Sequence, residues 1–261
     1  MHTARALFRL TRADSSAMAF LCLFIPVYAR TNDLALSLGR AIPLLFICMC
    51  TFIANDLDDL ERDQVNHPER PLPSRHLNPA TAAVLYFICL ALALVLTKRY
   101  VDERIAFWYY GLVTLSISYG YIVECLPVVK APYVAAATSV PVFIVAMSYP
   151  DERRLRVVAV ACFLFALGRE LCMDIEDRAG DVASLMHKLR PAPLAIAAFG
   201  LQIIGFALLL LQVRRSLDVF AALCMAGTLA LAGLSWFHLK KRPTARRLMK
   251  LQLLIGLYFL T

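Results

Sequence analysis

The chain has 261 residues, of which 60% are hydrophobic, and its mean hydropathy is +0.66. Apolar segments recur along its whole length, which excludes a soluble core and predicts a multi-pass protein of the lipid bilayer. The net charge of +8 comes without a stacking-aromatic motif or a folded basic domain, so it favours anionic lipid headgroups and excludes nucleic acid as a partner.

Apolar stretches in chain order predict about nine transmembrane helices of an all-α polytopic membrane protein. They run approximately over residues 17–29, 34–54, 79–96, 105–123, 131–147, 155–172, 191–211, 217–237 and 248–260. The ten-residue alternation of a membrane β-barrel is missing from these stretches. Because the sequence has no separate polar domain or low-complexity tract, we expect one transmembrane domain over residues 1–261.

The basic residues predict the orientation of these helices. If the N-terminus is cytoplasmic, most of the 27 lysines and arginines lie on the cytoplasmic side, in line with the positive-inside rule. The C-terminal run "KKRPTARRLMK" is then an anchor at the inner leaflet. We therefore expect a cytoplasmic N-terminus.

The first unusual feature is the acidic run "NDLDDLERD", residues 55–63, at the end of the second apolar stretch. At about 100° per residue, Asn55, Asp59 and Asp63 lie within a stripe about 80° wide on a helix. Asp56 lies at the edge of this stripe, and the remaining acids point elsewhere. The spacing therefore selects one face of the helix.

A second acidic run, "RELCMDIEDRAGD", covers residues 169–181 and closes the sixth stretch. Asp174, Asp177 and Asp181 share a stripe about 60° wide, with Glu170 on its flank. Both runs end even-numbered helices, so both are expected on the cytoplasmic side, where they can meet.

Converging carboxylates repel one another at neutral pH unless cations hold them. Hard oxygen ligands suit magnesium, which keeps open positions for the oxygens of a phosphate-bearing substrate. One such run alone would be typical of a solvated helix end. Two runs of matched spacing on helices of matched direction favour a metal site.

At these residues the chain resembles the UbiA superfamily of intramembrane prenyltransferases. The first run matches the motif N-D-x-x-D-x-x-x-D, and the second matches D-x-x-D-x-x-x-D. The segment "NHPERPLPSR", residues 66–75, resembles the family's Asn-x-x-x-Arg-Pro-x-Pro-Ser-Gly. The second run looks more like the branch that includes geranylgeranylglyceryl phosphate, homogentisate and chlorophyll synthases. The resemblance implies helices around a central lipophilic cavity.

The resemblance also implies the roles of individual residues. Magnesium would be held by Asn55, Asp56, Asp59, Asp63, Asp174, Asp177 and Asp181. The diphosphate would be contacted by Arg70, Lys130 and Arg178. The carboxylates expected to be essential for catalysis are Asp59, Asp63, Asp177 and Asp181. The active site is expected to face the cytoplasm.

The implied function is magnesium-dependent ionisation of an allylic prenyl diphosphate and transfer of the prenyl group to a lipophilic acceptor, aromatic or lipid-like. The alternative is a UbiA-type terpene cyclase, which closes the prenyl chain on itself without an acceptor. Three departures from the family pattern leave this choice open: Arg75 replaces a glycine, Leu126 replaces a tyrosine four residues before Lys130, and "VASLMHKLRP" replaces a Thr-Leu-Pro stretch. An ion transporter is disfavoured, because its acids should lie at mid-membrane depth.

Overall fold

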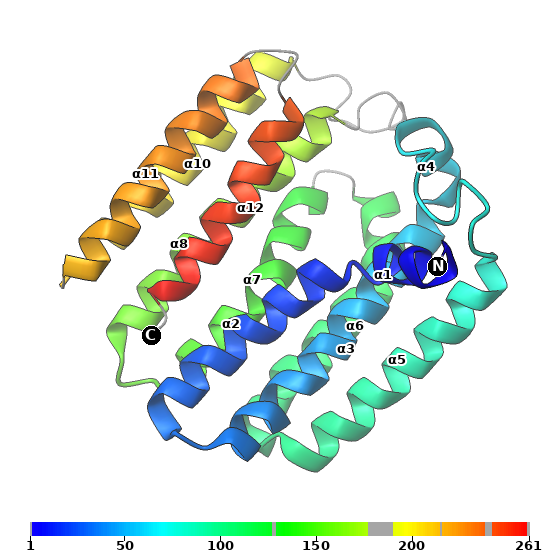
Figure 1. Ribbon diagram of the computed structural model, residues 1–261, viewed down its shortest axis with the longest axis horizontal. Coiled ribbons are helices and arrows are strands. Elements are labelled where there is room, and N and C mark those ends of the chain that lie inside the picture. The colour runs from blue at the N-terminus through cyan, green and yellow to red at the C-terminus, as the bar shows by residue number, and fades with distance from the viewer. Residues whose placement is uncertain (1, 127–128, 177–189, 215, 238–241, 260–261) are drawn as a thin grey trace. The chain divides into compact units, whose positions relative to one another are not determined.

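The computed structural model describes residues 2–126, 129–176, 190–214, 216–237 and 242–259, and these residues contain helices and no strand. The helices are α1 His2–Leu10, α2 Ala13–Thr31, α3 Leu34–Asp58, α4 Leu60–Asn66, α5 Pro79–Tyr100, α6 Glu103–Cys125, α7 Lys130–Ser148, α8 Arg153–Glu176, α10 Pro191–Leu210, α11 Ser216–Phe237 and α12 Arg242–Tyr258 (Figure 1). The predicted all-α class is confirmed for the described part of the chain.

Each predicted apolar stretch coincides with one of the longer helices. Among the described residues, five helices are long and apolar enough to cross a membrane: α3, α5, α7, α10 and residues 218–236 of α11. The count reaches six if α1 and α2, which meet at a 49° bend, form one span. Nine spans and a cytoplasmic N-terminus therefore remain predictions. The charges of α8, with arginines in its first turn and acids in its last, set it apart from these five.

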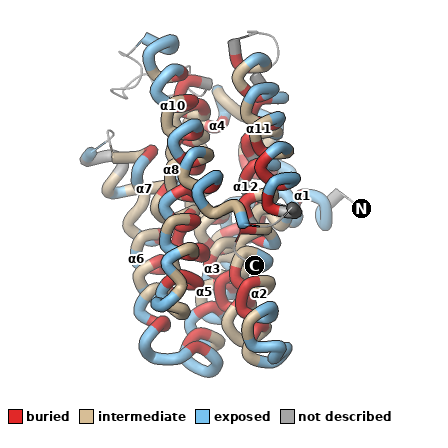
Figure 2. Tube along the Cα trace, turned by 90° about the vertical axis from the view of Figure 1, so that its left-hand side faces the viewer, coloured by how far each residue is buried: buried red, intermediate tan, exposed pale blue. Residues whose placement is uncertain are grey.

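Large apolar side chains on the outside of the helices fit a lipid environment. Phe87 and Phe107 are 65% and 71% exposed, and Ile196 and Leu234 are similarly open. Figure 2 shows exposed positions along the outer faces of the long helices, with buried positions behind them. In water such faces would be costly, whereas in a bilayer they contact lipid chains.

The described helices pack as two compact units. Unit 1 contains α1 to α6, and unit 2 contains α7 to α12. The prediction of one domain over the whole chain is not tested by this division and stays a prediction.

Unit 1 is built around α3, which packs against α2, α5 and α6. The Asp33 carboxylate caps the start of α3 by accepting a hydrogen bond of 2.9 Å from the Leu36 N–H. Asn78 caps α5 in the same way, ahead of Pro79 in the first turn. These caps fix where the two helices begin.

The C-terminal half of α3 joins α1 and α5 in one apolar cluster. Its buried members are Ala6, Leu10, Cys50, Ile53, Leu72, Leu77, Ala82 and Cys89. The cluster includes Leu72 and Leu77 from the segment between α4 and α5, so this segment is held against the helices by apolar packing. The end of α3 that carries the first acidic run is thereby fixed in place.

Unit 2 is built around α8, which packs against α7, α10 and α12. Small residues allow α8 and α10 to approach closely. A Cβ atom added at Gly168 would lie 2.5 Å from the Ala198 carbonyl oxygen, and one added at Gly205 would lie 3.1 Å from the Ala161 carbonyl oxygen. This close packing positions the helix that carries the second acidic run.

We expect Gly168→Ala to destabilise the protein by about 2 kcal/mol, because the new methyl group must push the α10 backbone away. The midpoint of thermal unfolding, followed by intrinsic fluorescence, should fall by about 5 °C. The control is Gly200→Ala on α10, where an added Cβ meets nothing within 4 Å. Equal midpoints for the two variants would contradict the close α8–α10 packing.

Candidate active site

The first acidic run lies across a helix break. α3 ends at Asp58 and α4 begins at Leu60, but the backbone hydrogen bonds continue through the break, from Asp59 N–H to Asn55 O at 2.9 Å and from Asp63 N–H to Asp59 O at 2.8 Å. The Asn55 side-chain amide donates to Asp59 Oδ2 at 3.0 Å. The predicted common face of these residues is therefore present, although the single helix expected for it is divided in two.

Arginines neutralise the carboxylates of this run. Asp59 pairs with Arg62 at 2.8 Å, and Asp63 accepts a hydrogen bond from Arg70. Asp56 lies between two guanidinium groups: Arg12 donates to its Oδ1 at 2.8 Å, and Arg70 lies 3.5 Å from the same oxygen. Asp56 and Asp63 are only 3% and 4% exposed, so these charges need partners.

Burial raises the pKa of Asp63 above its usual value, and the charge and hydrogen bond of Arg70 act in the opposite direction. The neighbouring Asp56 and Asp59 raise the pKa further. Arg70 therefore helps to keep Asp63 ionised, as an oxygen ligand for a cation must be.

Arg70 is held by a compact loop between α4 and α5. The Arg70 N–H donates to the His67 carbonyl at 3.0 Å, and the Ser74 hydroxyl donates to the Arg70 carbonyl at 2.6 Å. The Leu77 N–H donates to the Pro71 carbonyl at 3.1 Å, which joins the two ends of the loop. This loop places Arg70, which the resemblance assigned to the diphosphate, beside Asp56 and Asp63 of the first run.

Arg75 follows Ser74 at the end of the turn that begins at Arg70. Its φ is 58°, in the left-handed region that favours glycine. Its N–H donates to the Leu72 carbonyl at 3.0 Å, and its side chain is exposed. The positive φ of this turn explains why glycine suits position 75, although the turn forms here with arginine.

Arg75→Gly should stabilise the protein by about 0.5–1 kcal/mol, because glycine adopts this φ without strain. We expect the midpoint of thermal unfolding to rise by about 2 °C. Arg75→Ala removes the same charge and keeps the strain, so it serves as the control and should give no rise. A gain shared by both variants would trace to the lost charge and refute the backbone explanation.

Asp58 points away from this cluster, as the spacing predicted. A Cβ atom added at Gly120 of α6 would lie 2.7 Å from Asp58 Oδ2, so the Asp58 side chain lies against α6. Asp58 is exposed, whereas Asp56 and Asp63 are buried. The two neighbours Asp58 and Asp59 therefore have different surroundings.

The second acidic run is described as far as Glu176. Asp174 is 5% exposed, and its Oδ1 pairs with the Lys130 ammonium at 3.0 Å. Lys130 begins α7, so this pair joins the start of α7 to the end of α8. Lys130, which the resemblance assigned to the diphosphate, thus lies beside the second run within unit 2.

Three predicted site residues, Asp177, Arg178 and Asp181, lie outside the described residues. Glu170, expected on the flank of the second run, pairs with the adjacent Arg169 and is buried. The first run belongs to unit 1 and Asp174 to unit 2, so the meeting of the two runs remains a prediction.

Within the described part of the chain, no three carboxylate, histidine or cysteine groups are gathered closely enough to hold a metal ion. The donor chemistry nevertheless fits magnesium, because Asn55 and the aspartates of the first run offer only hard oxygen ligands on their shared face. The arginines described above act as counter-ions for these oxygens.

Arg12 is the site residue that the sequence interpretation missed. It lies at the bend between α1 and α2 with a φ of 41°, pairs with Asp56, and places its guanidinium 4.9 Å from the centre of the Phe52 ring. In the sequence it counted only as one basic residue on the cytoplasmic side. Its position in a polar interruption before the first long apolar stretch was the available signal.

Helices long enough to cross a membrane and acidic helix ends paired with basic residues are the features expected of the intramembrane prenyltransferase class. The model of the UbiA prenyltransferase family matches residues 16–256, so the chain belongs to this family. It is 31% identical over 154 residues to a digeranylgeranylglyceryl phosphate synthase of Thermococcus gammatolerans, an alignment that covers 55% of this chain and 54% of the relative. The chain spans about half the length of the curated relatives that it matches.

Solved structures share the fold. A UbiA homologue from Aeropyrum pernix K1 in its apo form matches with a TM-score of 0.78 at 15% identity, over 94% of this chain and 96% of that one. A UbiA homologue from Archaeoglobus fulgidus bound to GPP and Mg2+ matches with a TM-score of 0.65 at 15% identity, over 98% of this chain and 99% of that one.

Proposed function

We propose that this protein is a magnesium-dependent membrane prenyltransferase that transfers a prenyl group from an allylic diphosphate to a lipid-like acceptor. The arrangement that carries the proposal is the contact of Arg70 with both Asp56 and Asp63, which puts a diphosphate-binding type of cation among oxygen ligands. The name of the Thermococcus gammatolerans relative supports the acceptor class, and the bound GPP and Mg2+ of the Archaeoglobus fulgidus homologue support the donor and the metal.

The first metal-binding group in this proposal is the face formed by Asn55, Asp59 and Asp63, with Asp56 beside it. The second is the predicted stripe of Asp174, Asp177 and Asp181. Bound magnesium would neutralise the diphosphate and make it a better leaving group. This assignment requires the two acidic runs to meet on one side of the membrane.

The basic residues have a separate role. Arg70 can offer two parallel N–H groups to phosphate oxygens, because the guanidinium is planar and forked. Lys130 contributes a single ammonium from the start of α7, and Arg178 is proposed as a further contact of the diphosphate. The apolar interior keeps water from an allylic cation until the acceptor reacts. The cytoplasmic side is proposed for this site because the loops near it are basic.

The three departures from the family pattern keep a terpene cyclase as the second candidate. The two reactions differ in their need for an acceptor. In a cyclase a double bond of the same prenyl chain attacks the cation, whereas in a transferase the cation waits for an acceptor. Release of pyrophosphate in the absence of any acceptor therefore distinguishes them.

The experiment is to incubate the purified protein with magnesium and prenyl diphosphates of increasing chain length, with and without a prenylglyceryl phosphate acceptor. We expect pyrophosphate release only when the acceptor is present, with a product that contains both groups. Pyrophosphate and a cyclic hydrocarbon formed without acceptor would identify a cyclase and overturn the transferase assignment. No turnover with any donor and acceptor would overturn both.

A further inference from the structure

Unit 1 contains another candidate site, which is lined by basic residues and lies apart from the acidic run. It is a hollow of about 210 Å3 between α1 and the loop that follows α4. Its lining residues are Arg5, Ala6, Arg9, Glu69, Pro71 and His76. Two arginines from one helix and a histidine from the facing loop thus surround a space large enough for a phosphate group.

The two arginines are available to an external anion. Arg5 and Arg9 are four residues apart, so they lie on the same face of α1. Both are exposed, and neither guanidinium has an ion pair or hydrogen bond with any described residue. Two guanidinium groups on one face repel each other until an anion lies between them.

The loop side of the hollow is ordered by its own contacts. His76 Nδ1 lies 2.6 Å from Ser74 Oγ, which fixes the ring. Glu69 supplies the single carboxylate among the lining residues, and its Oε1 lies 3.8 Å from His67 Nδ1. The arginines therefore outnumber the carboxylate, and the hollow is positive overall.

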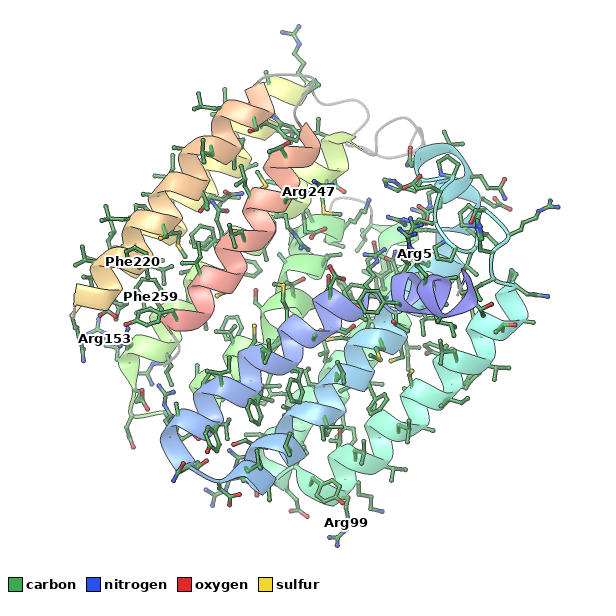
Figure 3. The ribbon with its side chains drawn as sticks, viewed as in Figure 1. Arg5, Arg99, Arg153, Phe220, Arg247 and Phe259 are labelled. Carbon is green, nitrogen blue, oxygen red and sulfur yellow. The ribbon has the colours of Figure 1, made fainter. Side chains whose placement is uncertain are left out.

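The position of α1 favours a ligand at the membrane surface. Ala6 and Leu10 are buried in the apolar cluster of unit 1, whereas Phe8 is 58% exposed. An amphipathic helix with exposed arginines and an exposed aromatic ring is typical of the headgroup level of a bilayer. Figure 3 shows Arg5 on α1 and Arg99 at the far end of α5.

The hollow is distinct from the candidate active site, although both use the same loop. Glu69 and Pro71 line the hollow, while Arg70 between them contacts Asp56 and Asp63. A group bound in the hollow would therefore touch the loop on either side of Arg70 without replacing its ion pairs.

We propose that this hollow binds the phosphate group of an anionic membrane lipid. Arg5 and Arg9 contact the phosphate oxygens, and Phe8 lies among the lipid chains beside it. The bound headgroup joins α1 to the loop that carries Arg70. The lipid is thus a structural ligand that holds the loop in place, independent of the prenyl donor and acceptor.

The test compares lipid binding by the intact protein and by two double variants. The protein in neutral detergent is titrated with phosphatidylglycerol, with phosphatidylcholine and with inorganic phosphate. The thermal midpoint and the number of lipids retained in native mass spectrometry are measured. Arg5→Ala/Arg9→Ala removes the two arginines of the hollow. Arg99→Ala/Arg104→Ala is the control, since it removes the same charge from exposed arginines that do not line the hollow.

We expect phosphatidylglycerol to raise the midpoint and to bind at least tenfold more weakly to Arg5→Ala/Arg9→Ala, with less than a threefold change in the control. Equal weakening in both double variants would mean attraction by net charge alone and would overturn the proposal. A rise produced equally by inorganic phosphate and lost in Arg5→Ala/Arg9→Ala would assign the hollow to a free anion and overturn the lipid. Prenyl transfer is not a readout, so failure here leaves the proposed activity untouched.

Discussion

Asp59→Asn is expected to lower prenyl transfer by on the order of 100-fold or more while leaving the protein folded. Asp59 is half-buried at the break between α3 and α4, where its Oδ2 accepts from Asn55 and its Oδ1 pairs with Arg62. Asparagine keeps the shape but loses the charge that a magnesium ligand supplies. Turnover should be measured as pyrophosphate release at saturating magnesium, together with the thermal midpoint.

The matched control for this change is the adjacent Asp58→Asn. The same substitution one residue earlier affects an exposed side chain that lies against Gly120 and away from the common face. Its turnover should stay within about threefold of the parent protein, the range of a surface change. Comparable losses in both variants, or near-normal turnover in Asp59→Asn, would remove Asp59 from the metal site.

Arg70→Lys is expected to reduce use of the prenyl diphosphate by about 10- to 100-fold at every chain length. Lysine keeps the charge but cannot offer the parallel N–H groups of a guanidinium. A single nitrogen, Arg70 Nη1, contacts both Asp56 and Asp63, so an ammonium group can keep these ion pairs and the loss traces to the missing fork. The loss should appear in kcat/KM for the diphosphate.

Arg75→Lys provides the comparison for this prediction. Arg75 belongs to the same loop and is exposed, and lysine retains both its charge and its backbone conformation. This variant should behave like the parent protein. If Arg70→Lys were as active as the parent protein and Arg75→Lys, Arg70 would be only an anchor of the loop, and its diphosphate-binding role would be refuted.

Much of the first acidic run could be predicted from the sequence, because helical spacing determines which side chains share a face. Asn55 and Asp59 are in contact as expected, and Asp58 lies elsewhere. The break at Asp59 was not predicted, since the backbone hydrogen bonds continue through it and the residue pattern does not change. Local periodicity thus identified the face but not the exact course of the backbone.

Contacts between segments far apart in the sequence were harder to predict than the shared face of one helix. Arg12 and Asp56 are separated by 44 residues, and no periodicity relates them. The left-handed conformation of Arg12 at the α1–α2 bend is also unexpected for an arginine. Such pairs depend on how helices pack, which a single sequence specifies only through the whole set of its apolar contacts.

The sharing of Asp56 between Arg12 and Arg70 has a thermodynamic consequence. Nη1 of Arg70 contacts both Asp56 and Asp63, so a diphosphate oxygen that binds to this nitrogen competes with the two carboxylates. A cation taken up by the carboxylates weakens this competition, and a bound diphosphate in turn makes the carboxylates easier to occupy. Under the proposed function, linkage then predicts that each ligand raises the affinity for the other by the same factor, so that cation and diphosphate bind cooperatively.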